Sequence, residues 1–228
     1  MTSKAQRTRP TFRSVPRLSL RDEAATQLRA HIASGSLTAG ELYSIGAIAA
    51  ELGVSATPVR EAVLELANED IVEIVHNRGF RVHVLTDVDL DHILELRLAL
   101  EVPAMGRLAE LKPAPDLLSF RPIAHTLVKN AKDGDFVEFV ALDREFHLGL
   151  TALLGNPRYV RLVDLLRRQA RLPGLRDLRG AEKFLRSAEE HDELLDLIEA
   201  GDRANAEALM KRHLGHTRGL WAGRAESD

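Results

Sequence analysis

Apolar residues recur at helical spacing at the start of the chain. Across Leu18–Ile32 they return every three or four positions with polar residues between them, and Gly35 follows as a helix stop. Ser44 is placed to cap a second helix that continues to Leu52, and Gly53 is placed to end it. These patterns predict two helices in the first part of the chain.

A third helix is predicted almost immediately afterwards. Ser55 or Thr57 caps it, and the helical pattern continues to about Asn68. Pro58 falls in its first turn, where a missing N–H costs nothing. Two short helices joined by a Gly-Val-Ser turn are typical of a helix-turn-helix.

Two β-rich runs follow, at residues 71–75 and 80–84, on either side of His76-Asn77-Arg78-Gly79. Runs of this composition around an Asn/Gly turn predict a β-hairpin. Three helices and a hairpin make a winged helix-turn-helix over residues 18–85.

The remaining sequence, residues 86–228, shows only helical periodicity, with Asp or Asn near most helix starts and Gly near several ends. We therefore expect an all-α bundle of six helices, and the fold class is mainly α. The expected helices cover residues 86–111, 115–133, 135–154, 157–172, 180–200 and 203–222.

Composition narrows the class of protein. The chain is 45% hydrophobic and has no cysteine, which favours a globular protein and excludes disulfides, thiolate nucleophiles and Cys-ligated zinc. No apolar run approaches the ~20 residues of a membrane span, so we expect a cytoplasmic protein with no membrane partner. Residues 1–17 carry basic residues before the first acid, and they form either an arm that contacts an acidic polymer or a solvated tail: Lys4, Arg7, Arg9, Arg13 and Arg17.

Polar side chains at the start of the third helix fit DNA recognition. Ser55, Thr57 and Arg60 are placed to reach base edges in a major groove, and Arg60 is able to grip guanine or a phosphate. The alternative is an ion pair of Arg60 with a nearby glutamate. Arg78 and Gly79 at the wing tip are placed to approach the DNA backbone or minor groove, or else form an ordinary turn.

The second part of the chain carries a candidate metal site. Asp143 and His147 are four residues apart on an apolar helix face, while His191 and His213 share apolar stripes with their own helices. Burying three histidines and an aspartate is costly unless a cation compensates their polarity. Such a donor set suits zinc, nickel, copper or iron. A plain helix ion pair of Asp143 with His147 is the alternative.

The residues between Leu52 and Ala62, with Ala39-Gly40-Glu41 before them and the wing turn after them, resemble the GntR family of transcription regulators. The all-helical part carries Glu95-x-Arg97 with Leu100-Glu101, Asp143-x-x-Phe146-His147, Glu190-His191 and His213-Leu214. With these motifs it resembles the FCD domain of the FadR-like branch. The resemblance implies that the four residues named above are metal ligands, with zinc the default and nickel possible. The sequence departs from the family at Gly46 and Ala56, where many members carry arginines that contact DNA, which suggests an altered operator.

Arg97 completes the hypothesis. It lies on the inward stripe of its helix, where it either pairs with Glu101 or binds a carboxylate beside the metal; the resemblance implies a role in effector binding. We therefore expect a ligand-responsive regulator, a repressor, that binds a palindromic double-stranded operator as a homodimer and responds to a small organic acid. The alternatives are a metal-dependent hydrolase that uses the His/Asp site and a purely structural metal site.

Overall fold

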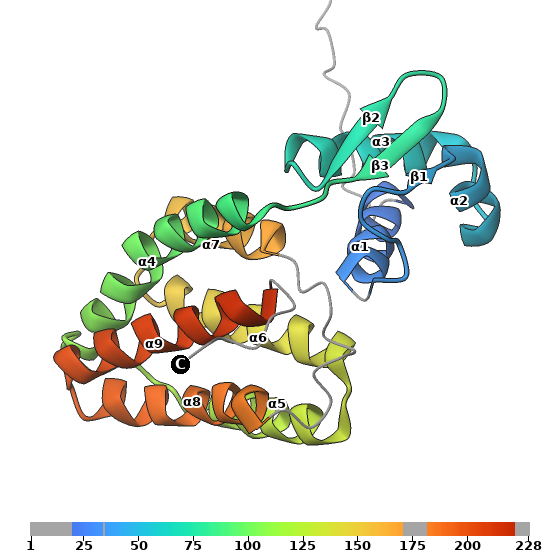
Figure 1. Cartoon of the computed structure of the whole chain (residues 1–228). Helices are drawn as coiled ribbons and strands as arrows, with labels where there is room; N and C mark the ends of the chain where they lie inside the picture. The colour runs from blue at the N-terminus through green and yellow to red at the C-terminus, as the bar shows by residue number, and fades with distance from the viewer. Residues whose placement is uncertain (1–19, 34, 171–181, 222–228) are drawn as a thin grey trace, which may run out of the picture.

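The computed structural model describes residues 20–33, 35–170 and 182–221. Within these ranges the chain forms a winged-helix unit and a helical bundle, joined by the short connector between β3 and α4 (Figure 1). The predicted arm at residues 1–17 and the expected first helical residue, Leu18, lie outside the described residues.

The three predicted helices of the winged-helix unit are present as α1 (Leu20–Ala33), α2 (Ile45–Leu52) and α3 (Ala56–Asn68). Ser44 precedes α2 and Gly53 follows it, as predicted. Gly53 adopts the left-handed backbone conformation, which residues with a side chain rarely adopt. Ser55, not Thr57, occupies the N-cap position of α3. The apolar stripe of α3 is buried against α1 and the sheet: Val59, Ala62, Val63 and Leu66.

The predicted hairpin consists of β2 (Val72–Val75) and β3 (Gly79–Val82), which pair antiparallel. A further strand, β1 (Leu42–Tyr43), pairs with the other edge of β3 and gives the sheet order β1-β3-β2. Sequence reasoning missed β1 because two residues are too short to show an alternating pattern.

The six predicted helices of the bundle are present. They are α4 (Asp87–Ala109), α5 (Arg121–Asp133), α6 (Phe136–Ala152), α7 (Pro157–Gln169), α8 (Glu182–Glu199) and α9 (Arg203–Trp221). The second of them begins at Arg121 and not near residue 115. Asp116 accepts a hydrogen bond from the Leu118 N–H and so stabilises a turn, and the helix starts where Pro122 fits its first turn.

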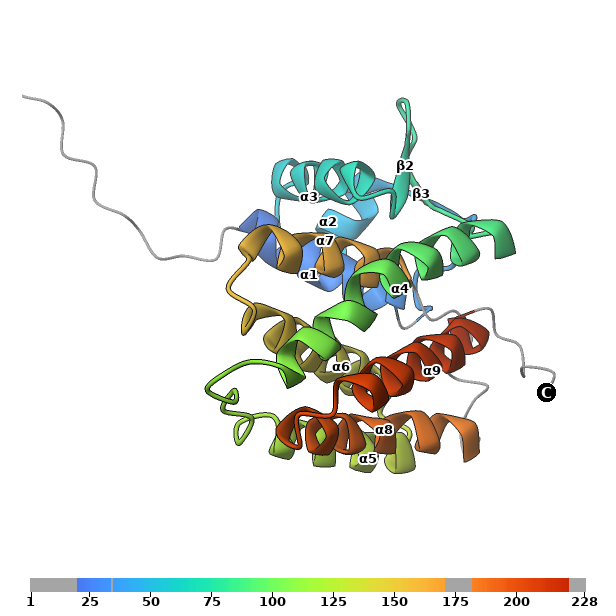
Figure 2. The same cartoon turned by 90° about the vertical axis from the view of Figure 1, so that its left-hand side faces the viewer.

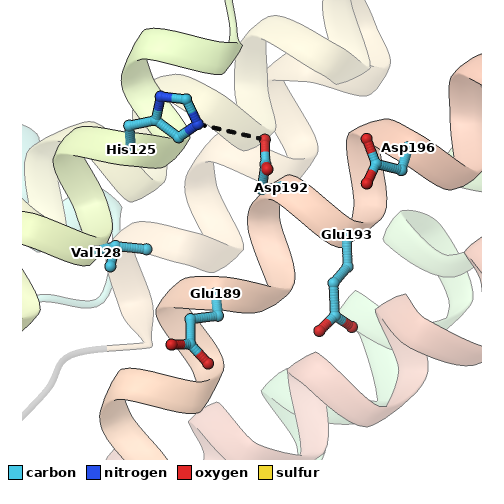
Figure 3. A pocket seen from close by; sticks show the side chains of 6 residues that line it. All are labelled: His125, Val128, Glu189, Asp192, Glu193 and Asp196. Atoms are coloured by element: carbon cyan, nitrogen blue, oxygen red, sulfur yellow. Dashed lines mark ion pairs between the residues drawn. The ribbon is translucent and has the colours of Figure 1, made fainter.

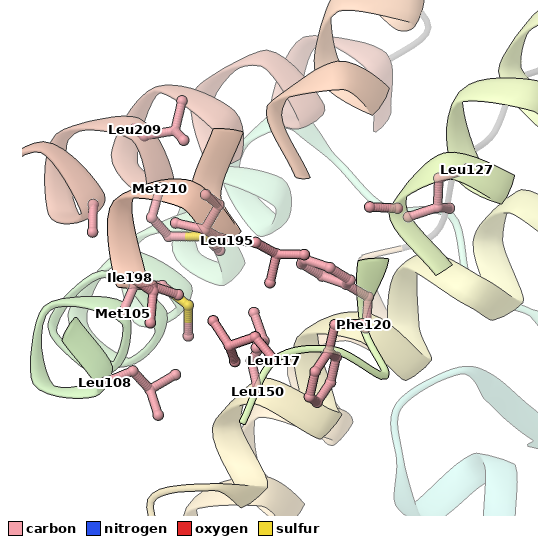
Figure 4. Packing of buried hydrophobic residues seen from close by; sticks show 14 of the residues in the cluster. Met105, Leu108, Leu117, Phe120, Leu127, Leu150, Leu195, Ile198, Leu209 and Met210 are labelled. Atoms are coloured by element: carbon pink, nitrogen blue, oxygen red, sulfur yellow. The ribbon is translucent and has the colours of Figure 1, made fainter. Parts of the chain in front are cut away.

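The bundle packs α9 against both α4 and α8, and α5 against α6 and α8 (Figures 1 and 2). Its core is a single apolar cluster to which these helices all contribute, with Met105 and Leu108 from α4 facing Leu195 and Ile198 from α8 (Figure 4). In the part of the chain that the structure describes, no helix is both long and apolar enough to cross a membrane.

Candidate functional site

One aspartate and three histidines meet inside the bundle. Asp143 and His147 come from α6, His191 from α8 and His213 from α9, and each offers a ligand atom within 4.8 Å of the others. The three imidazoles are buried, while the Asp143 side chain is 22% exposed. The spacing of Asp143 and His147 by one helical turn and the inward stripes of α8 and α9 bring the four groups to one point.

Hydrogen bonds orient two of the imidazoles. Nδ1 of His191 lies 3.0 Å from the carbonyl oxygen of Ala188, which only accepts, so Nδ1 carries the proton. Nδ1 of His213 lies 3.0 Å from a carboxylate oxygen of Glu190 and is held in the same way. Nε2 of each ring then faces the cluster and is the nitrogen available to a cation, in the arrangement by which outer carboxylates and carbonyls orient metal-binding histidines.

Unsatisfied polar atoms remain at the centre of the site. Nε2 of His191 lies 3.1 Å from Oδ1 of Asp143, so two acceptors face each other when the imidazole is neutral. His147 is 1% exposed, and neither of its ring nitrogens has a hydrogen-bond partner among the described residues. Burial, followed by the charge of Arg167, lowers the pKa of His147 well below its ordinary value, so this ring is neutral at neutral pH and keeps one lone pair for a ligand. A divalent cation would accept one lone pair from each of the three rings and one from the Asp143 carboxylate.

The carboxylate of the site is ionised. Burial alone would raise the pKa of Asp143, but His147, His191 and Arg167 together hold it well below its ordinary value. Burial also lowers the pKa of His213. Three imidazoles and one carboxylate fit zinc or nickel, so the residues present fit the expected metal.

A buried network of arginines and carboxylates adjoins this cluster. Nε of Arg97 lies 2.5 Å from Glu101, so the predicted alternative for Arg97, a pair with Glu101, is present. Arg167 of α7 binds the other oxygen of Glu101, and its Nη1 lies 2.9 Å from Oδ2 of Asp143. The two guanidinium groups lower the pKa of Glu101 to about 2 against the effect of burial. Arg97 is therefore connected to Asp143 through two intervening residues, Glu101 and Arg167.

Sequence reasoning assigned no role to Arg167 or Glu190. Arg167 follows Leu166 and precedes another arginine, so the sequence pattern predicts an exposed residue at the polar end of α7. In the structure its side chain is only 5% exposed. Glu190 was visible only as the neighbour of His191, yet it is 1% exposed and also lies within 3.2 Å of His216. Both residues bind side chains of other helices, so the packing of the helices decides their roles.

A separate hollow lies on the outer side of α5 and α8. It has a volume of about 430 Å³ and is lined by His125, Val128 and four acidic side chains, Glu189, Asp192, Glu193 and Asp196 (Figure 3). The His125 side chain is 70% exposed there, so it does not contribute to the buried cluster.

The residues predicted to read DNA are exposed in the winged-helix unit. Ser55, Thr57 and Arg60 all lie on the outer side of α3. Glu65, one possible partner of Arg60, instead binds Nη2 of Arg29 at 2.7 Å. Within residues 20–33, 35–170 and 182–221, Arg60 has no ion-pair partner, which leaves its guanidinium open to solvent.

The wing tip contains Arg78 and Gly79, as predicted from the hairpin pattern. Arg78 is exposed. A Cβ atom on Gly79 would lie 2.0 Å from the carbonyl oxygen of Tyr43, and Gly79 has a φ of +132°. Glycine is therefore required here by the pairing of β1 with β3, whatever its role toward DNA.

Two family models account for most of this architecture. The model for bacterial regulatory proteins of the gntR family matches residues 20–82, and the FCD domain model matches residues 92–216. The chain belongs to the GntR family. This pairing of domains places the GntR-family regulator in the FadR-like branch, as the sequence motifs indicated.

Individual relatives of the chain are also transcription regulators. The regulator is 32% identical over 198 residues to a probable D-xylose utilization operon transcriptional repressor of Paenarthrobacter nicotinovorans, covering 85% of this chain and 87% of the relative. It is 29% identical over 191 residues to the gluconate operon transcriptional repressor of Bacillus subtilis (strain 168), covering 79% and 76%. Families and relatives alike are transcription regulators and not enzymes, and nothing among them supports the hydrolase alternative.

The fold has solved counterparts. The structure of Escherichia coli McbR/YncC superposes with a TM-score of 0.77 at 24% identity, covering 90% of this chain and 97% of that one. A putative GntR regulator from Rhodococcus sp. RHA1 gives a TM-score of 0.73 at 23% identity, covering 91% and 100%. These likenesses show that the two-domain fold is shared.

Proposed function

We propose that this GntR-family protein is a cytoplasmic repressor whose FCD domain binds a divalent metal ion and a small organic acid. It acts as a homodimer on a palindromic operator, with residues 18–85 as the DNA-binding domain and residues 86–228 as the effector and dimerisation domain. The observation that carries the metal part is the buried cluster of three imidazoles and one carboxylate, in which His147 lacks any hydrogen-bond partner among the described residues.

Asp143, His147, His191 and His213 would hold the ion. Zinc is the first candidate and nickel the second, because both accept imidazole nitrogen together with carboxylate oxygen. When bound, the ion supplies positive charge and Lewis acidity at the centre of the bundle. Because its ligands come from three helices, binding also contributes to the stability of the folded state.

Metal analysis tests this assignment. Protein dialysed against chelator and reloaded with Zn²⁺ should hold about one ion per chain and unfold at a higher temperature than the apo protein. His191→Ala and the double variant His147→Ala/His191→Ala should lose both the ion and the thermal gain. His125→Ala is the matched control, because that imidazole is exposed on the outer hollow. Stoichiometric metal in the double variant would refute the ligand set.

Charge supports an acidic effector. Without the ion, Arg97 and Arg167 balance the carboxylates of Glu101 and Asp143. A divalent cation adds positive charge that is buried without compensation, and a small anion would offset it. The names of two relatives refer to D-xylose and gluconate operons, and gluconate is a sugar acid, so sugar acids are the first effector class to try.

Thermal shift of Zn²⁺-loaded protein against gluconate and other hydroxy and dicarboxylic acids tests the effector. Arg97→Lys keeps a positive charge beside Glu101 but loses the forked geometry, so it should retain metal and bind the acid about tenfold more weakly. Arg121→Lys on the outer face of α5 is the matched control, since Arg121 pairs with Asp192 away from the cluster. Unchanged acid affinity in Arg97→Lys would remove Arg97 from the effector site.

The DNA interface is proposed to consist of Ser55, Thr57 and Arg60 in the major groove, with Arg78 and Gly79 at the backbone or minor groove.

A duplex selected from a random pool provides the operator. Arg60→Ala should weaken its binding by about 1–3 kcal/mol and relax preference at one base pair per half-site, whereas deletion of residues 1–17 should weaken binding evenly and flatten the salt dependence. Arg161→Ala, an exposed arginine of α7, is the control. Intact affinity and preference in Arg60→Ala would mean that α3 is not the reading helix.

A further inference from the structure

Three consecutive residues at the end of α7 contact different parts of the molecule. Arg167 points into the bundle, where it binds Glu101 and Asp143. The next residue, Arg168, places Nη2 3.3 Å from Oε1 of Glu69, and Nε2 of Gln169 donates to the backbone carbonyl of Glu69 at 3.0 Å. Because successive side chains on a helix point about 100° apart, one turn touches both the buried site and the DNA-binding domain. Figure 2 shows α7 lying between α3 and α6.

Glu69 is connected to two helices of the DNA-binding domain, α3 and α1. It is the C-cap residue of α3, the helix that carries Ser55, Thr57 and Arg60. Its carboxylate also lies 3.0 Å from Nη2 of Arg29, which ties the end of α3 to α1. A force applied at Glu69 therefore moves α3 and α1 together.

The last turn of α7 is itself held in place. Ala170, which follows it, is buried against Leu90 and Ile93 of α4, next to Leu85 in the connector between the two domains. Asp164, one turn earlier, binds Nη1 of Arg168 at 2.9 Å. The turn is thus seated on the first part of α4, where the chain passes from the wing into the bundle.

We propose that this turn, residues 167–169, is an interdomain latch that fixes the orientation of α3 relative to the effector domain. The inference rests on the proposed function, because its purpose is to transmit ligand binding. Arg167 shares its guanidinium between Glu101 and Asp143, so an anion that enters the buried network competes for it and shifts the turn. The contacts of Arg168 and Gln169 with Glu69 then shift with the turn or break, which changes the orientation of α3.

Distance measurement between α3 and α7 tests the latch directly. The chain has no cysteine, so Glu61→Cys and Arg161→Cys, both at exposed positions, allow two spin labels to be attached. Labelled chains are mixed with excess unlabelled chains, so that only distances within one chain are read. The parent protein should give one narrow distance distribution, and the double variant Arg168→Ala/Gln169→Ala should broaden it roughly two-fold.

The control removes a neighbouring ion pair and leaves residues 167–169 themselves unchanged. Arg144 is the other arginine on Asp164, with Nη2 at 2.6 Å, and it lies on α6. Arg144→Ala should keep the narrow distribution. Glu69 itself is left unchanged, because its loss would also release Arg29 and loosen the DNA-binding domain. An unbroadened distribution in Arg168→Ala/Gln169→Ala, or equal broadening in Arg144→Ala, would overturn the proposal.

A second measurement links the latch to DNA. The affinity for the selected duplex is measured with Zn²⁺ and with chelator, and the ratio of the two reports coupling. The parent ratio should be on the order of 5-fold or more, and it should fall toward one in Arg168→Ala/Gln169→Ala while metal content stays the same. A coupling ratio in the double variant equal to that of the parent would also overturn the proposal. Failure of the parent to bind any duplex would instead count against the proposed function, and the latch would still be decided by the spin-label distances.

Discussion

Gly79 has no Cβ atom, and this allows a close backbone contact within the wing. Its α-carbon pairs with Val75 across the hairpin, and the backbone of Tyr43 in β1 passes directly beside it. A side chain would collide with the Tyr43 carbonyl and would also be strained at a φ of +132°. The residue is therefore a packing requirement of the three-stranded sheet.

We expect Gly79→Ala to lower the free energy of unfolding by about 2–4 kcal/mol, because both backbone strain and a steric clash must be relieved. Gly35→Ala is the comparison, since Gly35 also has a positive φ, of +74°, but nothing within 4 Å of its would-be Cβ. Gly35→Ala should lower the free energy of unfolding by only about 1–2 kcal/mol. Urea unfolding followed by circular dichroism measures both, and equal losses would show that the contact with Tyr43 is unimportant.

At the scale of elements, the start of α4 is the clearest case of local sequence setting a boundary. Thr86 accepts a hydrogen bond from the Asp89 N–H at 3.2 Å, and Asp89 accepts from the Thr86 N–H at 2.9 Å. This capping box satisfies two backbone donors that the first turn leaves open. Hydrogen bonds from the side chain and then the backbone of Thr86 lower the pKa of Asp89.

Thr86→Ala should therefore lower the free energy of unfolding by about 0.5–2 kcal/mol at neutral pH. Because the pKa of Asp89 is lowered in the folded state, its contribution is present above the ordinary aspartate pKa of about 3.9 and is lost as pH falls through the folded-state value. The difference between variant and parent should shrink accordingly in acid.

Ser44→Ala is the control for this prediction, because Ser44 stands at the N-cap of α2 but makes no side-chain cap hydrogen bond. Urea unfolding at several pH values measures both variants. A loss in Thr86→Ala that is constant from neutral to acid pH would contradict the role of the ionised Asp89.

At the scale of the whole molecule, the two larger apolar cores of the described residues lie in different domains. One contains Val59, Leu66 and Phe80 of the winged-helix unit, and the other contains Met105, Leu195 and their neighbours in the bundle. The proposed metal ligands come from α6, α8 and α9, all of which contribute to the second core. Metal should therefore stabilise one domain and leave the other unchanged.

Hydrogen exchange tests this division. Removing Zn²⁺ with chelator should speed amide exchange in α6, α8 and α9 by on the order of tenfold or more, since a bound ligand opposes local opening. Exchange in α1 and α3 should be unchanged, and His191→Ala should show the fast pattern with or without Zn²⁺. Equal acceleration in α1 would mean that the two cores unfold as one unit.

Much of the fold was accessible from local pattern. The helices of both domains are set by apolar periodicity and by end residues such as Gly53 and Asp135, whose effects act within a turn or two of the chain. The same periodicity marked His147, His191 and His213 as inward-facing. The cluster could be predicted from the amino-acid sequence because a short stretch of sequence encodes which side of a helix is buried.

What lies opposite a buried face is decided only by tertiary structure. Strand β1 exists because Tyr43 meets Phe80 across the sheet, and Arg167 is buried because α7 brings it to Glu101, a residue 66 positions away. Gln169 likewise reaches Glu69 across 100 positions. Periodicity within one helix carries no information about such distant partners. The sequence by itself therefore determined the elements and their inward faces, and only the packing of those elements decided the charge network and the contact between the two domains.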